Sequence, residues 1–100
     1  MRDVYIAWMG EEGLVRGIRA AKELRRAGLR VELPPVEQKF GKALAQADKL
    51  GARFALILGE DEVASGLWTL KTLADGTQKK CQERELIEFL KKERRRDEAW

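Results

Sequence analysis

Acidic side chains cluster in two short segments of this 100-residue sequence, and each segment begins with a glycine. The segments cover residues 10–13 and 59–62, and together they hold five carboxylates: Glu11, Glu12, Glu60, Asp61 and Glu62. A carboxylate accepts hydrogen bonds, so these residues suit a ligand that presents N–H groups, such as the N1–H and N2–H₂ of guanine or the N4–H₂ of cytosine. The same charge disfavours phosphate, and the sequence lacks the glycine patterns of phosphate-binding loops, so we expect no dinucleotide or nucleoside triphosphate site.

These acids could also be present without a nucleic-acid ligand. Glu11 and Glu12 sit where a helix would begin, and the helix dipole favours acids in a first turn without any ligand. Three acids directly after a buried strand, as at residues 60–62, need solvent or a partner. A metal site is the weaker alternative, because consecutive carboxylates with neither histidine nor a calcium-binding loop rarely form one.

Histidine and cysteine, the commonest general base and the most readily activated nucleophile, are nearly absent. The chain contains no histidine and a single cysteine, Cys81, which excludes an internal disulfide and fits a cytoplasmic protein. Lys79 and Lys80 precede Cys81 and could lower its pKa, but a structural thiol is the simpler interpretation. Without a recognisable pair of nucleophile and base, we predict no catalysis by this chain itself.

Basic residues are concentrated in two stretches, although the formal net charge is only +3. Residues 16–30 carry six cations against one acid, and residues 91–96 carry five against one. These stretches could hold phosphate groups, or they could be solvated helix faces. No apolar run approaches the roughly 20 residues of a membrane span, and the N-terminus lacks a signal-peptide pattern, so no membrane partner is expected.

Apolar periodicity predicts the elements that position these groups, with residues 10–13 and 59–62 as loops between them. Strands are predicted at residues 4–9, 29–33, 54–58, 67–73 and 77–80. Helices are predicted at residues 14–27, 40–50 and about 83–95. The first and third strands are wholly apolar, which is typical of buried strands, whereas the second alternates strictly, which is typical of an edge. The Asp75-Gly76 pair predicts a hairpin between the last two strands.

This order of elements predicts an α/β fold in three α/β/α layers. Two βαβ crossovers make the first three strands parallel, and the hairpin adds two more, which gives a five-stranded mixed sheet of order 2-1-3-4-5 with one antiparallel strand. In such a sheet, ligands bind beyond the carboxyl ends of the strands where the strand order reverses, and residues 10–13 and 59–62 would meet there. One domain is expected over residues 1–100, with about the last six residues frayed.

Much of the chain resembles one known family. The resemblance is strongest in ADKLGAR at 47–53, ALILGEDE at 55–62 and TLK at 69–71, and it begins with DVY at 3–5 and GEE at 10–12. These segments are similar to the C-terminal anticodon-binding domain of bacterial histidyl-tRNA synthetases, which belong to class IIa. The resemblance covers almost the whole chain, and its central run is long enough to be specific.

The resemblance implies a non-catalytic module that binds the anticodon stem-loop of tRNA-His beside the catalytic domain of a parent histidine–tRNA ligase. It implies a homodimer for the full-length protein and no cofactor in this domain, whereas the parent would use ATP and Mg²⁺. Besides the five acids, the expected RNA contacts are Lys42, Trp68, Thr69 and Lys71. Lys42 and Lys71 would meet backbone or base acceptors. Trp68 would stack on a base if its ring were exposed, although a tryptophan in a strand is more often part of the core or its rim.

The sequence departs from the family pattern at the second helix. The turn before this helix reads Glu37-Gln38-Lys39 instead of Gly-Arg-Ser, and only Lys42 remains of a lysine pair. A Lys-Tyr pair is replaced by Ala45-Gln46. These losses favour, as the alternative, a regulatory or protein-interaction module derived from a synthetase. The chain is interpreted as a fragment of a larger protein, although a short gene would look the same.

Overall fold

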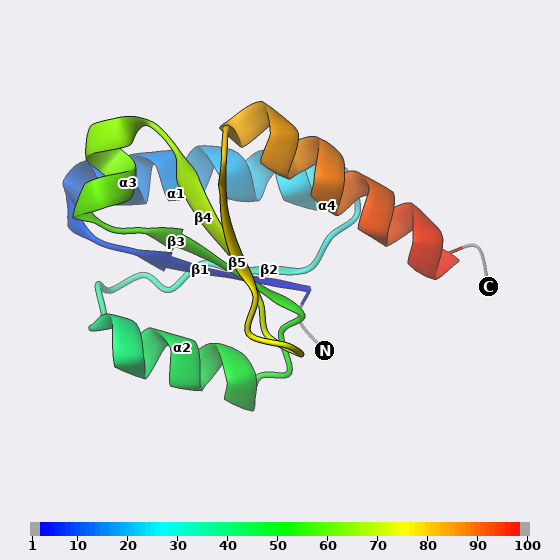
Figure 1. The fold of residues 1–100 in the computed structure, drawn as a ribbon, viewed down its shortest axis with the longest axis horizontal. Helices are drawn as coiled ribbons and strands as arrows, with labels where there is room; N and C mark the ends of the chain where they lie inside the picture. Colours follow the sequence, from blue (N-terminus) through cyan, green and yellow to red (C-terminus); the bar gives the residue numbers. More distant parts are fainter. Residues whose placement is uncertain (1–2, 99–100) are drawn as a thin grey trace.

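The computed structural model describes residues 3–98, which form five strands and four helices (Figure 1). The strands are β1 (Val4–Trp8), β2 (Val31–Glu32), β3 (Phe54–Leu58), β4 (Trp68–Thr72) and β5 (Gln78–Cys81). The helices are α1 (Gly10–Arg26), α2 (Phe40–Lys49), α3 (Glu60–Ser65) and α4 (Glu83–Glu98).

The strands form one mixed sheet of order β2-β1-β3-β4-β5, as predicted. The strands β2, β1 and β3 are parallel, β4 runs antiparallel to β3, and β5 runs antiparallel to β4. The hairpin turns at Gly76, which adopts φ +73° and donates its N–H to the carbonyl of Thr72. The wholly apolar runs form the central strands β1 and β3, because these strands are covered on both faces.

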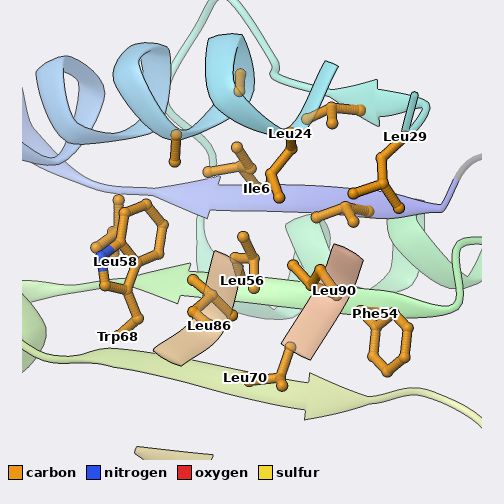
Figure 2. Packing of buried hydrophobic residues seen from close by; sticks show 14 of the residues in the cluster. Ile6, Leu24, Leu29, Phe54, Leu56, Leu58, Trp68, Leu70, Leu86 and Leu90 are labelled. Atoms are coloured by element: carbon orange, nitrogen blue, oxygen red, sulfur yellow. The ribbon is translucent and has the colours of Figure 1, made fainter. Parts of the chain in front are cut away.

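Helices cover both faces of the sheet, which confirms the three-layer prediction (Figure 1). The helices α1, α3 and α4 lie on one face, and α2 lies alone on the other. The larger core lies on the first face, where Leu24 of α1 and Leu86 and Leu90 of α4 meet the sheet residues Leu56 and Leu70 (Figure 2). On the second face, α2 packs through small side chains in a cluster made of Tyr5, Ala7, Ala43, Ala47 and Ala52.

The helix ends follow from local sequence. At the end of α1, Gly28 takes φ +92°, a conformation that glycine adopts without a steric penalty. Its N–H donates to the carbonyl of Arg25, and the N–H of Leu29 donates to the carbonyl of Leu24, which is a Schellman motif. The predicted end of α2 at Gly51 is also confirmed, with φ +73° at that residue.

Several predicted boundaries are wrong. The second strand is only Val31–Glu32 instead of residues 29–33, and β1, β4 and β5 differ from their predicted bounds by one residue at one or both ends. Residues 10–13 form the first turn of α1 rather than a loop, and residues 60–65 form α3, which the periodicity analysis missed because six residues are too few to show a helical period. The last helix runs to Glu98 rather than to about Arg95. The fraying expected at the end includes Ala99 and Trp100, which lie outside the described residues.

No helix within residues 3–98 is both long and apolar enough to cross a membrane.

Candidate functional site

The two acidic segments come together where the strand order reverses between β1 and β3. A pocket of about 430 Å³ lies at this point. Glu11 and Glu12 line it from the first turn of α1, and Glu60 lines it from the first turn of α3. All three side chains are exposed. The prediction that these segments meet at the switch point is therefore confirmed, and we call this cavity the switch-point pocket.

Backbone contacts fix the walls of the switch-point pocket. The N–H of Met9 donates to the carbonyl of Leu58 at 2.9 Å, which joins the ends of β1 and β3. Gly13 lets α1 approach the same carbonyl closely, because a Cβ at this position would lie 3.3 Å from the oxygen. A fourth acid, Glu37, lines the pocket from the loop before α2 and accepts a hydrogen bond from the N–H of Gly10. The sequence analysis treated Glu37 only as a departure from a family pattern.

A second pocket, of about 440 Å³, lies on the face of the sheet that α2 covers only in part. Because α2 packs over β1, it leaves the same face of β4 and β5 open beside it. The lining residues combine carboxylates, cations, an amide and apolar side chains: Phe40, Ile57, Asp61, Glu62, Thr69, Gln78, Lys79 and Lys80. We call this cavity the sheet-face pocket.

Glu62 is held at the wall of the sheet-face pocket by bonds within the protein. Its carboxylate accepts hydrogen bonds from the N–H of Gly59 at 2.8 Å, from Oγ1 of Thr69 at 2.9 Å and from Nζ of Lys80 at 3.0 Å. Burial by itself raises the pKa of Glu62, but the hydrogen bonds from Lys80, Thr69 and Gly59, with the positive charge of Lys80, outweigh burial and lower this pKa. Glu62 and Thr69 are both buried, so their polar atoms serve α3 and the sheet first.

The first turn of α3 faces both pockets. Glu60 lines the switch-point pocket and Asp61, the next residue, lines the sheet-face pocket. Both carboxylates are exposed, and both sit at the positive end of a helix, where acids are favoured. Consecutive residues on one short helix therefore place one acceptor in each cavity.

The predicted lysines lie apart from each other. Lys71 is half-buried on β4, two residues after Thr69, so the two side chains share one face of the sheet. Lys42 is exposed on α2 and lines neither pocket.

Of the two interpretations of Trp68, the structure shows core packing and not an exposed ring. This side chain is 1% exposed and packs in the larger core, near Leu58 in Figure 2. Alternation along β4 explains the difference, because Trp68 and Leu70 point toward α1 and α4 whereas Thr69 points toward the other face. The ring is therefore not available for stacking on a base.

The sequence analysis missed five residues of the sheet-face pocket: Phe40, Ile57, Gln78, Lys79 and Lys80. The register of the hairpin places Lys80 opposite Thr69 and Gln78 opposite Lys71. The Asp75-Gly76 turn could have given this pairing, because antiparallel partners lie at equal distances from a hairpin turn. No comparable signal existed for Phe40, because it reaches the pocket from α2, which is distant from the hairpin in sequence.

Cys81 has the properties of a structural thiol. It is 8% exposed, and burial raises its pKa, although the charge of nearby Lys79 acts in the opposite direction. Within the part of the chain that the structure describes, no three Asp, Glu or Cys side chains are grouped so that they could hold a metal ion.

Comparison with known proteins identifies the fold and the family. The family model described as the anticodon binding domain matches residues 3–93. A histidine–tRNA ligase of Thermotoga maritima is 39% identical over 75 residues, which are 75% of this chain and 18% of that protein. A histidine–tRNA ligase of Geobacillus thermodenitrificans is 38% identical over 96 residues, which are 96% of this chain and 22% of that protein. The chain thus spans about a fifth of the length of the curated relatives it matches.

Solved structures agree with the sequence matches. The crystal structure of histidyl-tRNA synthetase from a Nostoc species superposes with a TM-score of 0.81 at 33% identity. The superposition covers 92% of this chain and 22% of that one.

Proposed function

Since the chain belongs to the anticodon-binding domain family, with histidine–tRNA ligases among its relatives, we propose that it recognises the anticodon loop of tRNA-His as the non-catalytic part of a histidyl-tRNA synthetase. The observation that carries this proposal is the sheet-face pocket. It brings hydrogen-bond donors, acceptors and an aromatic wall into one cavity. A base that is splayed out of an RNA loop needs these three kinds of contact.

In the sheet-face pocket, Lys80 and Gln78 supply donors and Asp61 supplies an exposed acceptor. Phe40 and Ile57, both half-buried, supply apolar wall on which a base can lie. Lys80 remains 54% exposed although it donates to Glu62, so part of its hydrogen-bonding capacity faces the cavity. Glu62 acts here by positioning Lys80 and the start of α3 rather than by reading a base.

The switch-point pocket supports the recognition of base donors. Its polar side chains are the exposed carboxylates of Glu11, Glu12, Glu37 and Glu60, so it suits N–H groups and disfavours phosphate. Lys42 and Lys71 remain the proposed contacts to RNA phosphates or base acceptors. In the whole synthetase, the reaction with ATP and Mg²⁺ is assigned to the catalytic part and not to this domain.

The proposal is tested by a salt-titrated binding assay. A fluorescent hairpin with the tRNA-His anticodon is compared with a hairpin of identical stem and scrambled anticodon. We expect tighter binding of the first hairpin. Asp61→Asn and Glu60→Ala should each weaken it by about tenfold or more, because each removes a charged acceptor, with a smaller effect on the scrambled hairpin.

Lys42→Ala is the matched test for a phosphate contact. It should weaken the binding of both hairpins alike and reduce the salt slope by about 1.

Equal affinity of the unaltered chain for both hairpins would overturn anticodon recognition. Absent RNA binding together with self-association in sedimentation would favour the alternative, a protein-interaction module, which the altered second helix also favours.

A further inference from the structure

The two basic stretches of the sequence meet at one end of the molecule. The helices α1 and α4 run side by side in the same direction (Figure 1). Arg19 of α1 contacts Glu83 at the start of α4 at 3.4 Å, and Arg94 of α4 donates from Nε to the carbonyl of Gly28 at 3.0 Å. The second halves of both helices therefore share one end of the fold. Six cations gather there: Lys22, Arg25, Arg26, Arg30, Lys91 and Arg94.

Most of these cations remain in solvent although some make contacts within the protein. Arg26 is 66% exposed and Arg30 is 59% exposed. Lys22 and Arg26 are four residues apart on α1, so they lie in one row on its outer face. Arg25 is also exposed, and it donates to the carbonyl of Val31.

The acids near this end offset only part of the positive charge. Asp3 is buried, accepts a hydrogen bond from the backbone N–H of Arg30 and lies 3.6 Å from Nε of the same arginine, so it offsets one cation. Glu93 pairs with Arg53, which is not one of the six. Glu23 lies 3.4 Å from Arg26, and Glu88 is exposed on α4. The exposed acids of the two pockets lie at the other end of α1, about 25 Å away for a helix of 17 residues.

Helix dipoles explain only part of this clustering. Cations in the last turn of a helix are stabilised by its negative end, and this applies to Arg25 and Arg26 of α1. It does not apply to Lys22, one turn earlier, or to Arg30, which follows the helix. Lys91 and Arg94 also precede the last turn of α4, which ends at Glu98. Arg94 donates to the carbonyl of Gly28 at the end of α1, and Arg30 pairs with Asp3, so Lys22 and Lys91 are the two of the six that the helix dipoles and these contacts do not account for. A polyanion would relieve the repulsion among cations gathered at one end.

We propose that this end of the molecule, which we call the two-helix basic surface, binds the sugar–phosphate backbone of RNA independently of base sequence. The inference rests on the proposed function for the class of its partner, and it adds a second contact surface at the end opposite the pockets. Phosphate contacts position an RNA while base contacts specify it. The basic surface supplies affinity and orientation, and the two pockets supply the choice of anticodon.

The test uses the whole chain and a pair of matched double variants. Lys22→Gln with Arg26→Gln removes two charges from the two-helix basic surface. Lys49→Gln with Arg84→Gln removes two exposed charges elsewhere, and each pair contains one cation from the last turn of a helix. Binding of the cognate and scrambled hairpins is measured as a function of salt concentration. Circular dichroism checks that both variants are folded, and Lys22→Gln alone serves as the milder variant.

We expect Lys22→Gln with Arg26→Gln to weaken the binding of both hairpins by the same factor, so that the ratio of the two affinities is unchanged. Because this variant cannot neutralise two of the phosphates, its salt slope should fall by about 1.8. The wild type would then lose about tenfold more affinity than the variant between about 50 and 200 mM salt. The control variant should keep the wild-type slope.

Equal slopes for the two double variants would overturn the inference. So would a loss of binding to vesicles of phosphatidylserine and phosphatidylcholine with no change in RNA binding, since the surface would then serve a membrane. The proposed function fails separately, when the wild type binds both hairpins equally. The comparison of salt slopes remains decisive for the basic surface in that case.

Discussion

Neighbouring carboxylates on α3 have different roles because of how they are buried. Glu62 is 7% exposed and accepts three hydrogen bonds, whereas Glu60 and Asp61 are exposed and face the pockets. The sequence presents the three acids as equivalent. Glu62 is the third residue of the turn, and its side chain reaches back to the N–H of Gly59. This position makes Glu62 a structural acid, whereas Glu60 and Asp61 remain exposed at the pockets.

Glu62→Gln should lower the free energy of unfolding by about 1–3 kcal/mol at neutral pH, because it removes the charge that three donors share. Urea denaturation measures this difference. Glu60→Gln is the matched control in the same helical turn, and it should cost no more than about 1 kcal/mol from the helix dipole. Equal losses for the two variants would contradict the structural role of Glu62.

The pH dependence of stability provides a second test of Glu62. Its folded-state pKa lies below its ordinary value of 4.5, so the ionised carboxylate stabilises the fold at neutral pH. This contribution declines as the pH falls below about 4.5, and it is lost once the pH has fallen through the lower folded-state pKa. Urea denaturation at about pH 7 and about pH 3.5 should therefore show a smaller change for Glu62→Gln than for the wild type. An identical change in both proteins would rule out this linkage.

At the scale of elements, the contact between α2 and the start of α3 shapes the sheet-face pocket. Gly59 precedes α3 in an extended conformation that any residue can adopt, with φ −92°. The ring of Phe40 fills the space where a side chain would begin, since a Cβ on Gly59 would lie 2.7 Å from Cζ of Phe40 and 3.0 Å from Oε1 of Glu62. A glycine is needed here because of close packing rather than backbone conformation.

Gly59→Ala should therefore destabilise the domain by about 1–3 kcal/mol, because Phe40 or Glu62 must move. Gly41→Ala on α2 is the matched control. A Cβ there meets nothing within 4 Å, and alanine favours a helix, so this variant should gain up to about 1 kcal/mol. Thermal or urea unfolding of both variants gives the comparison, and effects of the same sign would show that Gly59 is not constrained by packing.

At the scale of the whole molecule, Cys81 reports on the opening of the larger core. It lies at the end of the edge strand β5 and belongs to the cluster packed by α1 and α4. Burial raises its pKa, so less of the thiol is ionised at neutral pH than in a free cysteine. A thiol reagent therefore meets both a steric and a chemical barrier in the folded protein.

Labelling of Cys81 at neutral pH should be at least about 100-fold slower than labelling of a short cysteine peptide, because the reaction requires opening of the fold. The rate should rise with urea in parallel with the loss of circular dichroism. Labelling at the peptide rate without denaturant would show that β5 is not held against the core as described.

The distribution of charge also belongs to the whole molecule. A net charge of +3 conceals an acidic end that carries the switch-point pocket and a basic end formed by α1 and α4. In the function proposed above, this separation would give one RNA two different kinds of contact, with carboxylates for bases and cations for phosphates. The two sets of variants described above test the ends independently.

The sequence by itself determined the strand order, the three layers and the meeting of the two acidic segments. These predictions depend on local patterns: apolar runs at 4–9 and 54–58, helical spacing in α2, and glycines that end helices. Chain chirality and the rule for crossover connections then leave few arrangements for parallel strands. The same patterns placed Glu11, Glu12 and Glu60 at one edge of the sheet, where the structure has them.

Only the tertiary structure decided which of these residues line a pocket. Trp68 is buried and Glu62 is bonded within the protein, because the register of β4 and β5 assigns each residue to one face of the sheet. Phe40 and Lys80 reach one pocket although they are distant in sequence, and the convergence of α1 with α4 unites two separate basic stretches. Burial and convergence are properties of packing between distant segments, so a local pattern along the chain does not contain them.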